Sequence, residues 1–221
     1  VPPNACDTHV HVFGDQARFP YAPTSGYRHP PATADELNAL HRALHIDRVV
    51  IVQPSGYGTD NSCILDGTRQ LKARARAVVA IDDKTTDAVL DSFHKDGARG
   101  IRVNIGQAPA EARTRLDAAC RRIAGRKWHV NTAANLELVA ALQDQIMASP
   151  VPIIIDHWVA AQPSLGTTQP HFDDFLKLLK TGKIYLKITD RIHTLSTQAP
   201  DFPDAAPLGR AFIQANPQRI L

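Results

Sequence analysis

The stretch PVPIIIDH at positions 150–157 decides the fold class, because it has the pattern of a buried β-strand that ends in two ionisable residues. Three consecutive isoleucines preceded by turn-forming prolines are typical of a strand covered on both faces. Asp156 and His157 follow at its carboxyl end, where burial is costly unless the groups are used or paired. We therefore expect a strand of a parallel sheet over Pro152–His157, with His157 either in a functional site or satisfied within the core.

Other short runs rich in Val and Ile alternate with longer helical stretches, which is typical of a parallel sheet covered by helices. The seven strands predicted in this way are Cys6–Val12, Arg48–Gln53, Ala75–Ile81, Gly100–Ile105, Trp128–Asn131, Pro152–His157 and Ile184–Thr189. An eighth strand is expected to begin at Arg219, and Leu221 ends the chain before that strand is complete.

The segments between these strands carry helix signals. The first opens with Thr33 and Glu36 in capping-box spacing and places Leu37, Leu40 and Leu44 on one face. Four further helices are predicted, each with a residue that ends it: Thr86–Asp96 before Gly97, Ala110–Ala124 before Gly125, Leu136–Ser149 before Pro150, and Phe172–Thr181 before Gly182.

This alternation predicts an α/β fold, specifically a (β/α)₈ TIM barrel. No glycine-rich phosphate fingerprint follows an early strand, which argues against an open doubly wound sheet. We expect one domain over residues 1–221, incomplete at its C-terminus with the eighth strand truncated, because such barrels usually need about 250 residues. Two proline-rich loops, residues 14–31 and 193–207, follow strand ends on the face where barrel enzymes place their active sites.

Composition narrows the function classes. The formal net charge is +3, with 43% hydrophobic and 21% charged residues, so the chain is not expected to bind nucleic acid. Cys6, Cys63 and Cys120 are odd in number and match no zinc spacing, which favours a reducing compartment. No apolar run reaches the roughly 18–20 residues of a membrane span, and no signal peptide is evident. We expect a cytoplasmic protein that does not contact membranes.

The segment DTHVHVF at positions 7–13 is the sharpest chemical motif. Because strand side chains alternate, His9 and His11 face the same side. In a barrel interior, the two imidazoles could hold a metal or polarise a carbonyl. An isolated His-x-His is more often a pair on a half-exposed edge strand, but His157 at the end of another strand makes a shared site the better account.

The sequence resembles the amidohydrolase superfamily, of the amidohydrolase-2 type, and within it the branch that contains 2-pyrone-4,6-dicarboxylate lactonase. The resemblance covers nearly the whole chain and rests on motifs in the expected order. These are CDTHVHVFG from Cys6, RFPY from Arg18, IDRVVIVQPSGYGTDNS from Ile46, GARGIRVN from Gly97, WHVN from Trp128, PVPIIIDH from Pro150 and YLKIT from Tyr185.

The resemblance implies roles for individual residues. His9, His11 and His157 match histidines that polarise the ester carbonyl without a metal. Tyr27 and Ser55 match positions that contact the substrate. Arg102 matches an arginine that binds a substrate carboxylate, and a guanidinium fork suits that group. Without the family, Arg102 would equally be an ion-pair partner inside the barrel, and Ser55 an ordinary loop residue.

The chain also departs from the family pattern. The aspartate that acts as general base in the family's eighth strand would lie just beyond Leu221. A second carboxylate-binding arginine is replaced by Gly106, Gln107 and Ala108. The arginine near the end of the seventh strand corresponds either to Arg191 or to the position of His193.

We therefore predict a hydrolase that opens a carboxylate-bearing lactone in the catabolism of aromatic compounds. Its partner is a small-molecule carboxylate, and it is a possible homo-oligomer. One alternative is a metal-dependent hydrolase or non-oxidative decarboxylase of the same superfamily, with His9, His11 and His157 holding zinc or manganese. The expected cofactor is thus none or one divalent metal. A non-catalytic binding barrel is the third hypothesis.

Overall fold

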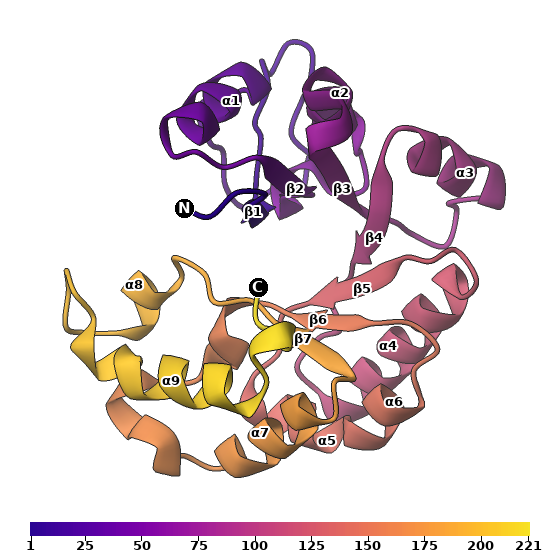
Figure 1. Ribbon diagram of the computed structural model, residues 1–221. Coiled ribbons are helices and arrows are strands. Elements are labelled where there is room, and N and C mark those ends of the chain that lie inside the picture. Colours follow the sequence, from indigo (N-terminus) through magenta and orange to yellow (C-terminus); the bar gives the residue numbers. More distant parts are fainter. The chain divides into compact units, whose positions relative to one another are not determined.

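The computed structural model describes residues 1–221, which divide into two compact units, Val1–Arg102 and Val103–Leu221. Both units alternate parallel strands with helices (Figure 1). This pattern confirms the predicted α/β class. The prediction of one domain over residues 1–221 stays a prediction, and the units are described in turn.

The first unit is a parallel sheet of four strands in chain order. Its strands are β1 (Cys6–Val10), β2 (Arg48–Val52), β3 (Ala75–Ala80) and β4 (Ala98–Arg102). The helices between them are α1 (Ala34–Ala43), the short η1 (Ser55–Tyr57), α2 (Ser62–Leu71), η2 (Lys72–Arg74) and α3 (Asp87–Lys95). Because the strands are parallel, their carboxyl ends share one edge of the sheet.

Helix α1 begins where the sequence predicts, at the capping box of Thr33 and Glu36. The capping box is formed, with Glu36 N donating to Thr33 Oγ1 and Thr33 N donating to the Glu36 carboxylate. Leu37 is buried, whereas Leu40 and Leu44 are 54% and 48% exposed. The buried residues of α1 are Ala34, Leu37 and His41.

The second unit holds a parallel three-stranded sheet. Its strands are β5 (His129–Thr132), β6 (Ile153–Ile155) and β7 (Ile184–Leu186). Its helices are α4 (Pro109–Ile123), α5 (Leu136–Ala141), α6 (Gln143–Ala148), η3 (His157–Ala160), η4 (Pro163–Thr168), α7 (Phe172–Lys180), α8 (Ile192–Leu195), η5 (Pro203–Ala205), α9 (Ala206–Ala215) and η6 (Pro217–Arg219). Ile220 forms an isolated parallel bridge with Leu186, whereas Arg219, where the eighth strand is predicted to begin, lies in η6.

Most helix boundaries agree with the glycine and proline signals. Gly97, Gly125 and Gly182 all have positive φ after the ends of their helices. The helix expected over Leu136–Ser149 is instead two short helices, because Leu142 leaves helical geometry with φ −102° and ψ 7°. No helix of the structure is long and apolar enough to cross a membrane.

Candidate active site

Of the histidine pair of the first unit, His9 lies on an irregular part of β1 and His11 directly follows its end. Asp7 pairs with Val49 and Val10 with Ile51, so β1 carries one extra residue between these pairs. Such bulges re-aim side chains and are frequent beside active sites. The rings of His9 and His11 lie edge to face with their centroids 5.2 Å apart, so the predicted convergence of this pair is observed.

Hydrogen bonds to a main-chain carbonyl and to a carboxylate position the residues of the histidine pair. His11 Nδ1 lies 2.8 Å from the carbonyl oxygen of Val52 at the end of β2. A carbonyl only accepts, so this nitrogen carries the proton and a neutral ring presents an unprotonated Nε2. Asp7 accepts from His9 N at 3.1 Å and contacts buried His41 Nε2 at 3.1 Å, which ties the strand to α1.

The loop over residues 14–31 packs onto η1 and brings Tyr27 to Ser55. Gly56 N donates to the Tyr27 hydroxyl at 3.2 Å, and Ala22 N donates to Gly56 O at 2.9 Å. Tyr21 stacks on Tyr57 with a centroid separation of 4.9 Å. Tyr27 is 41% exposed and Ser55, which follows β2, is also exposed. Both residues predicted to contact the substrate therefore face solvent.

Two groups beneath this loop are held neutral by their surroundings. Burial raises the pKa of the Tyr57 phenol, whose oxygen accepts from Gly14 N at 3.1 Å. Burial also raises the pKa of the Cys63 thiol. Neither group is suited to act as an anion at neutral pH. Tyr57 and Cys63 therefore have a structural role in supporting the loop.

Arg102 ends β4 and is half-buried. Its Nη1 donates to the carbonyl oxygen of Gln53 at 2.8 Å. Gln53 is itself 1% exposed, and its side-chain amide donates to Gly58 O and Asp60 O. The guanidinium is therefore anchored at the same sheet edge as the end of β2, with further N–H groups left to bind an anion.

In the second unit, His157 opens a left-handed turn directly after β6. The four residues His157–Ala160 have φ between 49° and 60°, although none is glycine. Left-handed geometry costs non-glycine residues about 1–2 kcal/mol each. Strain of this kind persists where the surroundings hold it and clusters at functional sites. The strand predicted to reach His157 therefore ends at Ile155.

Neighbouring segments hold this turn. His157 Nδ1 lies 3.0 Å from Thr189 Oγ1, and Trp158 Nε1 donates to Thr189 O at 2.8 Å. Trp158 N donates to Lys187 O at 3.0 Å. The ring and the turn are thus positioned by the chain that follows β7.

Beneath the turn lies a buried polar cluster that the sequence interpretation did not identify. Asn131, Asp156 and Lys187 are 0%, 1% and 1% exposed. Lys187 Nζ donates to Asn131 Oδ1 at 2.7 Å and lies 3.5 Å from Asp156 Oδ1, while Asn131 Nδ2 donates to Asp156 Oδ2. In the sequence, this cluster is indicated only by Lys187, a charged residue within the apolar run YLKIT.

Arg191 and His193 lie apart from this cluster. Both are exposed at the start of α8, and Arg191 N donates to Thr189 Oγ1 at 3.3 Å. His193 Nδ1 contacts Asp190 O. The substrate-binding roles of Arg191 and His193 stay predictions.

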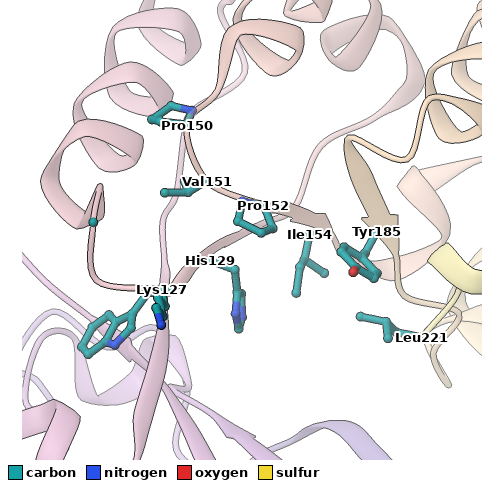
Figure 2. Close-up of a pocket in the computed structure, with 10 residues that line it drawn as sticks. Lys127, His129, Pro150, Val151, Pro152, Ile154, Tyr185 and Leu221 are labelled. Carbon is teal, nitrogen blue, oxygen red and sulfur yellow. The ribbon is translucent and has the colours of Figure 1, made fainter.

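A pocket of about 720 Å³ lies at the opposite end of the second unit's strands from His157. His129, Ile154 and Tyr185 point into it from neighbouring strands, beside Pro152 and Leu221 (Figure 2). It is mostly apolar and lies toward the amino ends of β5 and β6. Barrel enzymes place their chemistry at the opposite, carboxyl ends, so this pocket is not the candidate active site.

Comparison with known proteins agrees with these observations. A 4-sulfomuconolactone hydrolase from Hydrogenophaga intermedia is 32% identical over 226 residues, covering 100% of this chain and 74% of that protein. A 2-pyrone-4,6-dicarboxylate hydrolase from Comamonas testosteroni is 28% identical over 231 residues, covering 100% of this chain and 76% of the relative. Both relatives are hydrolases of lactones by name.

A crystal structure from Acinetobacter baumannii with citric acid bound superposes with a TM-score of 0.83 at 22% identity, covering 99% of this chain and 82% of that one. This likeness confirms the predicted barrel fold. The family model for amidohydrolases matches residues 6–221. The chain therefore belongs to the amidohydrolase family and is a hydrolase.

Proposed function

We propose that the protein hydrolyses a lactone that carries a carboxylate, with His9, His11 and His157 as its catalytic histidines. The observation that carries the proposal is the pair of imidazole rings at the end of β1, at the sheet edge where Arg102 also lies. His157 follows the carboxyl end of β6, and in a barrel all carboxyl strand ends meet at one face. Three imidazoles at that face suit the carbonyl of an ester.

The substrate class is supported by the anion-binding groups and by the relatives. The matched hydrolases act, by their names, on a sulfonated muconolactone and on a pyrone dicarboxylate, which are both anionic lactones. In this chain Arg102 would bind the carboxylate, while Tyr27 and Ser55 would contact the rest of the ring. Only one arginine is placed in this way, so a single carboxylate is the expected anchor.

The hydrogen bond of His11 determines how the site would work without a metal. Because Nδ1 is used by Val52 O, the ring can donate to the substrate carbonyl only when Nε2 is also protonated. A charged imidazolium would stabilise the oxyanion that forms when water attacks the ester.

A metal-dependent hydrolase or decarboxylase is the second candidate, and the same hydrogen bond favours it. Histidines that bind metals usually give their other N–H to a carbonyl or carboxylate, leaving the free nitrogen for the ion. His9, His11 and His157 would then hold zinc or manganese, which would polarise the carbonyl as a Lewis acid. Metal analysis of the purified protein, with activity before and after chelation, separates the candidates.

The decisive experiment uses full-length protein with a panel of lactones and aromatic carboxylates. His9→Ala and His157→Ala should each remove most of the turnover. His45→Asn is the matched control, because His45 is exposed at the end of α1 and its φ of 56° suits asparagine. Unchanged kinetics in both the His9 and the His157 variants would refute the proposal.

A further inference from the structure

The buried cluster of Asn131, Asp156 and Lys187 connects three neighbouring strands of the second unit. Asn131 lies in β5, Asp156 directly follows β6, and Lys187 directly follows β7. Each side chain contacts both others, through Lys187 Nζ, both oxygens of Asp156 and both ends of the Asn131 amide. The cluster therefore joins the carboxyl ends of all three strands.

Stability alone does not account for a cluster of this kind. Removing two charges from water is costly, and well-packed apolar side chains of similar volume are often equally stable in the same place. The neighbours of the cluster show that apolar residues fill this core readily, since Ile153, Ile155 and Leu186 are 0–2% exposed. The charged pair instead fixes which atoms lie where, because each hydrogen bond has one geometry that satisfies it.

The cluster lies immediately beneath the strained turn that carries His157. Asp156 is the residue before the turn, and its carbonyl oxygen accepts from Val159 N at 3.2 Å. Lys187 contacts the turn in a second way, because its carbonyl oxygen accepts from Trp158 N at 3.0 Å. Two residues further on, Thr189 contacts the His157 ring. The short segment from Lys187 to Thr189 thus contacts Asp156 at the start of the turn, the backbone of the turn and the His157 ring.

We propose that Lys187 is a positioning residue for His157. Its ammonium fixes Asp156 against β5 and β7, and its main chain fixes the turn, so the His157 ring keeps one orientation toward the site. The inference rests on the proposed catalytic role of His157. Asn131 assists by orienting both charged partners, and neither Lys187 nor Asn131 is required to touch the substrate.

The test is Lys187→Met in the full-length protein, with Lys183→Met as the matched control because Lys183 is exposed just before β7. Two quantities are measured: the kcat and KM for a carboxylate-bearing lactone, and the ¹⁵N resonances of the His157 ring, assigned by their loss in His157→Asn. We expect kcat to fall roughly 10- to 100-fold. KM should change less than about twofold, the ring resonances should move, and the control should resemble the wild type.

A second variant covers the case in which Lys187→Met does not fold. Asp156→Asn combined with Lys187→Met removes both charges, so it leaves no buried carboxylate without its cation. If Lys187 positions His157, this double variant folds, the ring resonances stay displaced and kcat stays low. A purely structural role would instead restore both the resonances and kcat to wild-type values, which would overturn the inference.

The outcomes separate this inference from the proposed function. Full turnover in His157→Ala, or no lactone hydrolysis by the wild type, would refute the proposed function, and the ring resonances would still report whether Lys187 orients His157. Unmoved resonances and unchanged kcat in Lys187→Met would overturn the inference and leave the proposed function intact.

Discussion

Replacing Arg102 with methionine tests how the substrate is bound. Methionine keeps much of the aliphatic length but removes every N–H donor. A hydrogen bond to a charged group is worth about 1.5–3 kcal/mol, so losing two such bonds to a carboxylate should cost about 3 kcal/mol or more. That loss corresponds to a fall in kcat/KM of roughly 150-fold or more, expressed mainly in KM.

The same substitution should lower the free energy of unfolding by less than it lowers the free energy of substrate binding. The bond from Arg102 Nη1 to Gln53 O is 2.8 Å long, and its removal should lower the free energy of unfolding by about 1 kcal/mol. This cost is measured separately by urea denaturation. It is too small to unfold the protein, so the kinetic effect can be read without a folding defect.

The assay compares two lactones that differ only in whether they carry the carboxylate. Arg102→Met should depress kcat/KM for the carboxylate-bearing lactone and affect the uncharged one less than about threefold. Arg99→Met is the matched control, because Arg99 lies on the same strand, is half-buried and also donates to main-chain carbonyls. Equal losses on both lactones would refute the assignment of Arg102 to the carboxylate.

Three further outcomes are expected. Thr33→Ala should lower the free energy of unfolding by about 1 kcal/mol in urea denaturation, because it removes the capping box of α1; an unchanged midpoint would contradict that role. Burial raises the pKa of the Cys63 and Cys120 thiols, whereas Cys6 is exposed, so a thiol reagent at pH 7.5 should modify one cysteine in the native protein and all three in denaturant. Phe212→Ala should cost about 3–5 kcal/mol by thermal or chemical unfolding, because the ring is 0% exposed; a loss below 1 kcal/mol would contradict its place in the core.

The fold was predictable because its signals are local. Seven apolar runs gave seven strands, and glycines after three helices gave their ends. Predictions failed where tertiary packing chose between local options. The helix predicted over Leu136–Ser149 breaks at Leu142. In α1, the three leucines predicted to share one face differ in burial, because Leu37 is buried whereas Leu40 and Leu44 are exposed. Nothing in the spacing of the α1 residues predicts that His41 is buried and contacts Asp7.

The candidate site was predictable only in part. The pattern His-x-His predicts that His9 and His11 face the same side, and their rings are observed together. The bulge that carries them depends on the pairing of β1 with β2, which the sequence of β1 does not contain. In the sequence, Lys187 is similarly only a lysine within an apolar run. Its contacts with Asn131 and Asp156 depend on the packing of two other strands beside it.

The same buried ammonium bears on the choice between the two mechanisms. A metal held by His157 would lie near the carboxylate of Asp156, which commonly serves as a ligand or as support for one. Here Lys187 already places a positive charge 3.5 Å from that carboxylate, in a setting where water does not screen it. A divalent cation nearby would be repelled by this ammonium and would compete with it for Asp156. The charge arrangement of the second unit therefore weighs against Asp156 as a metal ligand.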